Sequence, residues 1–438
     1  MLDIANFIAT RRDRGRHTSE ELADFAAAVA NGSVPDYQLS AWLMAAFLNP
    51  LSIEETAWLT RAMADSGEIM DLTGLPKPWV DKHSTGGVGD KTTMVLLPLL
   101  AACGLTVVKM SGRGLGITGG TLDKLSAIPG FRTNLTPHEM KEQAKLIGLA
   151  LTGQTPNLAP ADKVLYALRD TTGTVGSIPL IVSSVLSKKL AGGAETIVLD
   201  VKCGSGGLVQ TEQEARKLAA TLADVGKLLK LRVRIALTDM SQPLGSAMGN
   251  ALEVKEAVQV LTGRARSAPV LRFRSLCIEL AGLTLEACGM KDTLEDGKKA
   301  AEECLANGSA LKKFQYWCQS QGATVDVTEP SFEFPNAPTI KTYNTPSTGW
   351  ASVLDAQTFG RGVMRLGGGR KRKEDLIDPR VGIELHACVG QRLEIDAPLF
   401  TIHATDEETA DKVAARTFEG VEITESSPPK RPLVLDLY

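Results

Sequence analysis

The first stretch of the chain, residues 1 to about 64, has the spacing of apolar and polar residues that is typical of helices. A Ser-Glu-Glu sequence at 19–21 stands before an Ala-rich apolar run and predicts a helix start. Ser52 and Glu55 have the spacing of a capping box before the next helix. Because no alternating, strand-like segment interrupts this stretch, we predict that it consists of helices.

From about residue 78 the pattern changes to short apolar runs, rich in β-branched residues, that end at glycines or polar residues. Three such runs are 105–110, 196–201 and 233–237. Helical stretches separate the runs, and this alternation predicts an α/β sheet.

Two further helices are predicted at 161–191, because Pro160 and Pro179 each suit a helix start and a Gly-Gly pair follows the second helix. A proline-rich stretch near 330–346 then predicts a linker. Beyond it, alternating runs predict a small α+β module over 345–438.

Composition narrows the class of protein. At about 150 residues per domain, 438 residues predict about two to four domains. Aromatic residues make up only 5% of the chain, so the cores must be mainly aliphatic. A formal net charge of −3 provides no overall basic field for nucleic acid, and we expect no nucleic-acid partner. Seven cysteines without a CxxC pair predict neither a disulfide framework nor a zinc cluster.

Two further features of the sequence indicate where in the cell the protein is located. The apolar run at 94–105 is too short to span a bilayer and contains Pro98 and Gly104. The first residues are acidic before they are basic, which is the reverse of a secretory signal. We therefore expect a cytoplasmic protein that has no membrane partner.

The segment 81–93, DKHSTGGVGDKTT, concentrates hydroxyls, glycines and lysines before a predicted helix. Free backbone N–H groups and the positive end of a helix suit an oxyanion. A Walker A loop is disfavoured, because Asp90 stands between Gly89 and Lys91. The alternative for the whole segment is a glycine-rich turn with a purely structural role. His83 within the segment can either contact a ligand or cap the local backbone.

A second glycine-rich segment, 109–124, follows a predicted strand, and its residues 114–119 match GxGxxG. A dinucleotide-binding loop should open a long helix that leads to another strand. Pro129-Gly130 ends this segment too early for that unit. We therefore predict a second set of N–H and hydroxyl groups for an anion.

The third candidate lies on the helical pair. Ser184 and Lys188 are four residues apart and so project from one helix face, while Arg169 lies near the end of the preceding helix. A serine and two cations can hold a planar ligand and stabilise developing negative charge. The alternative is that both cations are solvated or paired with Asp170. The basic cluster at 361–373 is predicted to be a solvated surface.

Four ordered blocks together resemble the pyrimidine nucleoside phosphorylases, the family that includes thymidine phosphorylase. The blocks are DKHSTGGVGD (81–90), SGRGLGITGGTLDKL (111–125), GQTPNLAPADK (153–163) and DMSQPLGSAMGNALEV (239–254). The resemblance runs essentially from end to end. Ile117, Ser126 and Cys203 depart from the family's usual His, Glu and Thr.

The resemblance implies an α/β fold with a small helical domain, a larger α/β domain and a C-terminal α+β module, hinged across a cleft. It places the helical domain at 1–64 and 161–191, and the phosphate-binding α/β domain with its central mixed sheet at 78–154 and 195–329. It also implies a homodimer without an organic cofactor or a divalent metal.

The implied reaction is phosphorolysis of pyrimidine nucleosides (uridine, thymidine and deoxyuridine) to free base and (deoxy)ribose 1-phosphate, as in pyrimidine salvage. Phosphate is then the nucleophile and needs only orientation and charge balance. The residues implied for phosphate are Lys82, His83, Ser84, Thr93, Lys109, Met110, Ser111 and Thr121. Those implied for the base are Arg169, Ser184 and Lys188, and the catalytic set is His83, Arg169 and Lys188.

The resemblance further implies a monovalent cation, potassium. Oxygen-rich sites suit such hard cations. The implied ligands are the carbonyls of Gly89, Lys91, Leu244 and Ala247 and the carboxylate of Glu256. The alternative for Glu256 is an acid on a surface helix.

Lys109 bears on the choice of sugar. The broader pyrimidine enzymes carry Lys at this position, and thymidine-restricted relatives carry Met. An ammonium can donate to a 2′-hydroxyl, whereas a thioether is a poor partner. A thymidine-restricted phosphorylase, an anthranilate-type phosphoribosyltransferase and a lipoyl-like binding module remain the alternatives.

Overall fold

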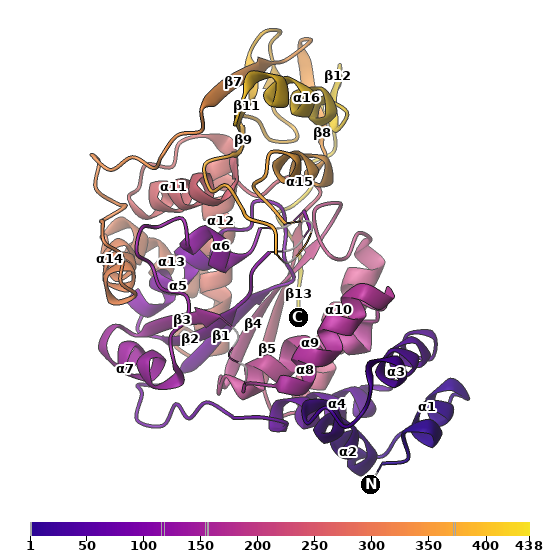
Figure 1. The fold of residues 1–438 in the computed structure, drawn as a ribbon. Helices are drawn as coiled ribbons and strands as arrows, with labels where there is room; N and C mark the ends of the chain where they lie inside the picture. Colours follow the sequence, from indigo (N-terminus) through magenta and orange to yellow (C-terminus); the bar gives the residue numbers. More distant parts are fainter. Residues whose placement is uncertain are drawn as a thin grey trace.

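The computed structural model describes residues 2–114, 116–117, 119–153, 155, 157–370, 372 and 374–438. In Figure 1 a helical region lies at the lower right, a sheet with its helices occupies the middle, and a smaller module lies at the top.

The helical domain combines two separate stretches of the chain. Phe25 and Trp42 from the first stretch share a core with Leu165 and Leu180 from the second. This burial of apolar surface joins the two stretches. Its helices are α1 (Ile4–Arg12), α2 (Ser19–Ala30), α3 (Asp36–Leu48), α4 (Ile53–Asp65), α8 (Pro160–Thr172) and α9 (Ile178–Ala191).

Local sequence signals set most of the boundaries of these helices. The capping box of Ser52 and Glu55 is confirmed at the start of α4. At α2 the cap lies one residue earlier than the serine at 19: Thr18 accepts a hydrogen bond from the Glu21 backbone at 3.2 Å, and the Glu21 carboxylate accepts one from the Thr18 backbone at 2.8 Å. Either hydroxyl residue suits an N-cap, and only the reciprocal bond to Glu21 decides between them.

The central sheet has the strand order β13-β5-β4-β1-β2-β3. Strands β1 to β5 are parallel, and β13 pairs antiparallel to β5, so the sheet is mixed as predicted. The carboxyl ends of β1 and its neighbours meet at one edge, where ligands of open α/β sheets bind. The strands are β1 (Trp79–Ser84), β2 (Thr106–Ser111), β3 (Leu149–Gly153), β4 (Thr196–Cys203), β5 (Arg232–Asp239) and β13 (Val434–Leu437).

Helices pack around this sheet, and the apolar run at 94–105 belongs to one of them. The residues of α5 from Thr92 to Ala101 are all buried, and the helix packs against α12 and α14. Among the described residues, no helix is both long and apolar enough to cross a membrane. The helices are α5 (Thr92–Ala102), α6 (Thr121–Leu125), α7 (Pro137–Ile147), α10 (Glu212–Leu228), α11 (Asn250–Leu261), α12 (Ala268–Ala287), α13 (Leu294–Ala306) and α14 (Ser309–Ser320).

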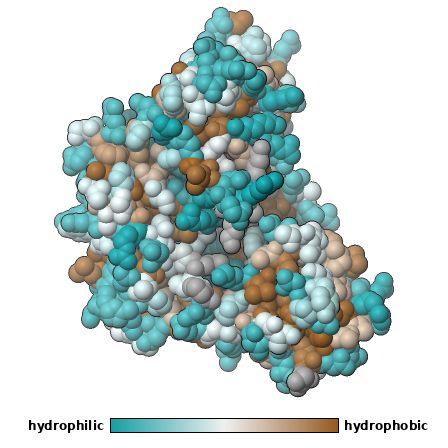
Figure 2. All heavy atoms as spheres, in the orientation of Figure 1, coloured by the Kyte–Doolittle hydropathy of each residue, from teal (hydrophilic) through white to brown (hydrophobic). Residues whose placement is uncertain are grey.

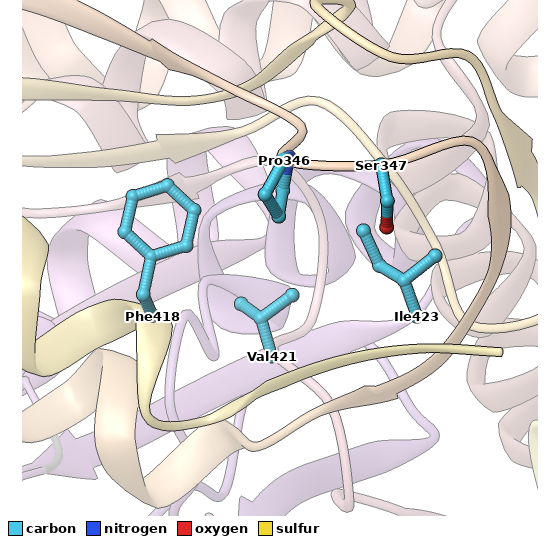
Figure 3. A pocket seen from close by; sticks show the side chains of 5 residues that line it. All are labelled: Pro346, Ser347, Phe418, Val421 and Ile423. Atoms are coloured by element: carbon cyan, nitrogen blue, oxygen red, sulfur yellow. The ribbon is translucent and has the colours of Figure 1, made fainter.

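The C-terminal module contains two small sheets, ordered β10-β8-β12 and β6-β9-β11-β7, around its own core. A hollow of about 470 Å³ lies within it, lined by Pro346, Ser347, Phe418, Val421 and Ile423 (Figure 3). None of these lining residues is a predicted site residue. The elements are β7 (Thr339–Asn344), β8 (Gly349–Leu354), α15 (Ala356–Arg365), β9 (Gly382–Leu385), β10 (Arg392–Leu393), β11 (Pro398–Ala404), α16 (Glu407–Phe418) and β12 (Val421–Thr424), joined by β6 (Ala247–Met248).

The predicted boundaries of this module need correction. Strand β7 lies inside the predicted proline-rich linker, because it pairs with β11. Strand β13 leaves the module and joins the central sheet. Strand β6 comes from the α/β part of the chain and pairs with β9. These pairings depend on partners far away in the sequence, so local patterns do not reveal them.

Candidate active site

The first glycine-rich loop folds back on the end of β1. The Ser84 hydroxyl donates to Asp90 at 2.5 Å, and the Gly86 backbone donates to the same hydroxyl at 3.2 Å. Lys82 donates to the Thr92 side chain at the start of α5. The loop therefore holds Lys82 and Ser84 beside the helix start, as an anion site requires.

Asp90 organises this loop, although the sequence marked it only as the residue that breaks a Walker motif. It accepts hydrogen bonds from the Thr92 backbone and hydroxyl at 3.2 and 2.7 Å, and its backbone carbonyl accepts one from Lys124 at 2.6 Å. Burial would raise the pKa of Asp90, but the ammonium groups of Lys82, Lys202 and Lys124 hold it well below its usual value.

Buried lysines gather around the ends of β1 and β2. Lys109 donates to the carbonyl of Lys82 at 2.5 Å and lies 3.6 Å from Asp81, which also pairs with Lys189 at 2.7 Å. Burial and the charge of Lys189 lower the pKa of Lys109 to about 7. Sequence reasoning missed Asp81 and Lys189, because they meet only after folding.

His83 lies among the same cations. Burial, followed by the charges of Lys189, Lys109, Lys188 and Lys82, holds the pKa of His83 well below its ordinary value. His83 is therefore a neutral imidazole, which can donate and accept hydrogen bonds without carrying charge. The cations left without full compensation make this edge of the sheet suitable for an anion.

The remaining residues predicted for phosphate lie on β2 and at two helix starts. Ser111 ends β2 and is half-buried, whereas Met110 before it is buried. Thr93 is buried in the first turn of α5, and Thr121 begins α6. Strand order thus brings the β1 and β2 residues to the same edge of the sheet.

The second glycine-rich loop is fixed by an ion pair with the C-terminal module. Asp123 accepts a hydrogen bond from the Gly114 backbone at 2.7 Å and another from the Arg370 guanidinium at 2.7 Å. The Gly116 backbone donates to the Arg370 carbonyl at 3.0 Å. The interpretation of 361–373 as a solvated surface is therefore wrong at Arg370, which is buried.

Some predicted positions lie outside the described residues. In the second glycine-rich loop these are Leu115 and Thr118, and in the block 153–163 they are Gln154 and Pro156. Lys371 and Lys373 of the basic cluster also lie outside them.

The three residues predicted for the base lie on α8 and α9. The Lys188 ammonium donates to the Ser184 hydroxyl at 2.8 Å, so the predicted shared face exists. Its acidic partner is Asp162 at 2.5 Å, so the alternative of a pair with Asp170 is wrong. Asp162 lies in the first turn of α8, which packs beside α9, whereas sequence proximity had favoured Asp170.

Arg169 is also buried, but it faces the backbone. Its guanidinium donates to the carbonyls of Val175 and Leu180 at 2.7 and 2.9 Å and lies 5.8 Å from the Tyr166 ring. Burial lowers the pKa of Arg169, and the Asp162 carboxylate opposes that shift. In this conformation Arg169 orders the turn between α8 and α9. The alternative that Arg169 is solvated or paired with Asp170 is wrong.

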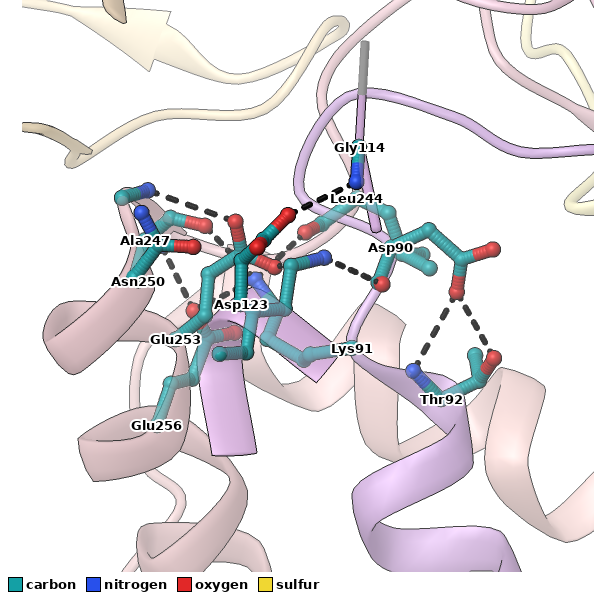
Figure 4. A network of polar contacts seen from close by, with 12 residues as sticks. Asp90, Lys91, Thr92, Gly114, Asp123, Leu244, Ala247, Asn250, Glu253 and Glu256 are labelled. Atoms are coloured by element: carbon teal, nitrogen blue, oxygen red, sulfur yellow. Dashed lines mark hydrogen bonds and ion pairs between the residues drawn. The ribbon is translucent and has the colours of Figure 1, made fainter. Parts of the chain in front are cut away.

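Of the residues predicted for potassium, Lys91, Leu244, Ala247 and Glu256 come together around a different cation (Figure 4), and Gly89 lies beside them. The Lys91 ammonium donates to the carbonyls of Leu244 and Ala247 and to the Glu256 carboxylate, each at 2.8 Å. Glu256 is buried, so the alternative of a surface acid is wrong. Lys91 contributes its side chain here, and an ammonium stands where the sequence predicted a metal ion.

Comparison with known proteins gives three matching family models. The a/b domain of the glycosyl transferase family matches residues 76–311, and the helical bundle domain of that family matches 5–67. The pyrimidine nucleoside phosphorylase C-terminal domain matches 350–424, in the region for which a lipoyl-like module was the alternative.

Individual relatives cover the whole chain. The pyrimidine-nucleoside phosphorylase of Bacillus subtilis (strain 168) is 44% identical over 425 residues, which are 97% of this chain and 97% of that protein. The thymidine phosphorylase of Sinorhizobium medicae (strain WSM419) is 40% identical over 428 residues, which are 98% of this chain and 97% of that protein.

A crystal structure of anthranilate phosphoribosyltransferase from Thermus thermophilus has a TM-score of 0.59 at 19% identity. It covers 72% of this chain and 98% of that chain, and at this identity it shows a shared fold alone. The sequence blocks, the domain models and the full-length relatives together show that the chain belongs to the family of pyrimidine-nucleoside phosphorylases.

Proposed function

We propose that this chain transfers the pentose of a pyrimidine nucleoside to inorganic phosphate, releasing the free base and (deoxy)ribose 1-phosphate. Uridine, thymidine and deoxyuridine are the proposed substrates. The observation that carries the proposal is a group of buried ammonium ions beside β1 and β2. Lys109 and Lys189 share the carboxylate of Asp81. Lys82 donates to the Thr92 side chain and, among the described residues, has no acidic partner of its own in hydrogen-bond contact. A doubly charged phosphate supplies the missing negative charge.

Phosphate is assigned to the loop side of the site. An oxygen of phosphate attacks C1′ of the pentose, the bond from C1′ to the base nitrogen breaks, and its electron pair leaves with the base. Orientation and charge balance are sufficient, because phosphate is already an anionic nucleophile. The residues assigned to phosphate are Lys82, His83, Ser84, Thr93, Lys109, Met110, Ser111 and Thr121.

The base is assigned to the helical domain, where Ser184 and Lys188 share one face of α9. Negative charge develops on the oxygens of the departing base, and the cations of Lys188 and Arg169 stabilise it. Lys188 is one of the groups that lower the pKa of His83, which supports placing the base between α9 and the end of β1. Exclusion of water from this space limits hydrolysis.

The sugar preference is assigned to Lys109 of β2, whose ammonium lies beside the Lys82 carbonyl and the Asp81 carboxylate of β1. An ammonium that donates to a 2′-hydroxyl favours ribose, because a deoxyribose lacks this hydroxyl and leaves the buried ammonium without an acceptor. This supports activity on both uridine and thymidine over a thymidine-restricted enzyme.

The proposed assembly is a homodimer in the cytoplasm. Helix α3 exposes Tyr37, Met44, Phe47 and Leu48, and Leu48 is 68% exposed. Figure 2 shows hydrophobic residues gathered at the lower right, over the helical domain. An apolar face of this kind is typical of an interface between protein chains.

The test is incubation with uridine in the presence and absence of phosphate, with the products followed by chromatography and phosphorus NMR. We expect uracil and ribose 1-phosphate only when phosphate is present. Base release that continues unchanged without phosphate contradicts the proposal. A parallel arm offers anthranilate, pyrophosphorylated ribose and magnesium, and turnover there would favour the phosphoribosyltransferase.

A further inference from the structure

The ammonium of Lys91 is enclosed by oxygen atoms from a distant part of the chain. It donates to the carbonyls of Leu244 and Ala247 and to Glu256 Oε2, each at 2.8 Å (Figure 4). The Lys91 side chain is wholly buried and that of Glu256 is 3% exposed. Two carbonyls and a carboxylate around one positive charge form the oxygen-rich surrounding that hard cations prefer.

The other atoms around this ammonium are already engaged. The Gly89 carbonyl accepts the Lys91 backbone N–H at 3.0 Å, and Glu256 also accepts the Ser246 backbone N–H at 3.1 Å. A Cβ at Gly245 would lie 2.8 Å from the Lys91 nitrogen and 2.0 Å from the Glu256 carboxylate. Since backbone atoms pack directly against the pair, these residues do not fit an additional ion.

Charge leads to the same conclusion. Lys91 and Glu256 balance each other, and the next acid along α11, Glu253, pairs with Lys124 at 2.7 Å. A second cation here would lie beside the Lys91 ammonium in a buried setting, where repulsion between like charges is strong.

We propose that Lys91 supplies the cation of this site from the chain itself, so that the protein works independently of monovalent metal ions. Lys91 is then a positioning residue that holds the anion-binding loop at 85–91 against the segment 244–247. This proposal rests on the proposed function only for the measurement of KM for phosphate, since Tm and refolding yield need no reaction.

The Lys91 ammonium affects phosphate binding because it joins the anion-binding loop to the segment 244–247, which contacts the C-terminal module. The Leu244 backbone donates to the Val88 carbonyl at 3.1 Å, within the anion-binding loop. The Ser246 hydroxyl donates to the Leu385 carbonyl at 2.7 Å, and β6 pairs with β9 in the C-terminal module. Removal of the ammonium leaves the Glu256 carboxylate buried without its partner and loosens the contact between loop and module.

The test compares Lys91→Thr with Lys91→Met in potassium chloride and in choline chloride at equal ionic strength. Thr leaves space for an ion, whereas Met fills the space without a charge. In choline, we expect Lys91→Thr to lower Tm by about 5 °C and to raise KM for phosphate about tenfold. Potassium should restore most of both losses in Lys91→Thr and neither in Lys91→Met.

The native protein and Lys313→Thr are the controls. Lys313 donates to the carbonyl of Ile147 at 2.6 Å. Its replacement also breaks a hydrogen bond between an ammonium and a backbone carbonyl, but this bond does not involve the residues around Lys91. We expect no potassium-specific change in Tm or KM for either protein. If Lys91→Thr does not fold in choline, its refolding yield in the two salts replaces Tm.

Two results overturn the proposal. One is a native protein whose Tm or activity rises when potassium replaces choline. The other is a Lys91→Thr protein whose Tm or refolding yield does not respond to potassium. Because these two stability readouts need no substrate, they separate this proposal from failure of the proposed reaction.

Discussion

Buried positive charge dominates the candidate site at the level of single residues. Desolvation and neighbouring cations lower the pKa of buried Lys109 to about 7, and they hold the pKa of partly buried His83 well below its ordinary value. A bound anion offsets that repulsion and so favours the charged form of Lys109. Affinity for anions must therefore depend on pH.

Binding of sulfate tests this dependence, because sulfate keeps its double charge across neutral pH. As pH rises through about 7, free Lys109 loses its proton and binding must restore it, so sulfate affinity falls. We expect Kd to rise about tenfold between about pH 6 and about pH 8.5. His83 stays neutral over this range and adds nothing to the change.

Calorimetric titration measures this effect, and Lys109→Met is its control. The variant should bind sulfate more weakly at low pH and show a much smaller change with pH. An equal change in the variant and the native protein would assign the pH dependence to another group.

The same substitution separates the two sugars. We expect Lys109→Met to lower kcat/KM for uridine more than for thymidine, because only uridine offers a 2′-hydroxyl to the lost donor. The difference should be about tenfold, typical of one hydrogen bond to a charged group. Steady-state kinetics on both nucleosides measures it. Equal losses would assign Lys109 to phosphate alone.

Sequence reasoning predicted single residues well only where their partners are near in the chain. Ser184 and Lys188 share a helix face because helix geometry places residues four apart together. The ion pairs of Lys188 with Asp162, Lys189 with Asp81 and Arg370 with Asp123 connect different elements. Helical or strand periodicity contains no information about such partners.

Among the elements, the second glycine-rich loop depends on a contact from outside its own domain. Arg370 of the C-terminal module donates to Asp123, which also holds the Gly114 backbone. The loop carries Ser111 at one end and Thr121 at the other, so its position affects both hydroxyls.

We therefore expect Arg370→Gln to raise KM for phosphate about fivefold while KM for the nucleoside changes little. The nearby Arg365, which is exposed on the same module, provides the matched control Arg365→Gln. Kinetics with each substrate varied in turn measures the effect. If both KM values rise together, Asp123 and Arg370 serve general stability and not the phosphate loop.

Local signals set the elements themselves. Helix caps and prolines marked α4, α8 and α9, and apolar runs that end in glycine marked β2 and β4. Strands β1 and β3 were not among the predicted runs. Strands β6 and β13 were also missed, since β6 is only two residues long and β13 depends on β5 as its partner. Short strands of this kind form through pairing and have little preference of their own.

For the whole molecule, the exposed apolar face of α3 predicts the assembly. Leu48→Glu should convert the proposed dimer to monomers, because a charge in the centre of an apolar interface loses its water. Analytical ultracentrifugation measures the change. Leu376, which is 96% exposed on the module, provides the control Leu376→Glu. A native protein that sediments as a monomer contradicts the proposed homodimer.

The pairing of β13 with β5 has a consequence for how the protein is made. During synthesis β5 emerges well before β13, and its open edge stays unpaired until the module of residues 339–424 has been translated and 434–437 has left the ribosome. A chaperone that binds exposed strand edges would therefore have to stay bound to the edge of β5 until β13 is synthesised. Removal of residues 434–437 would leave that edge of the central sheet open, so a truncated protein should aggregate more readily than the intact one.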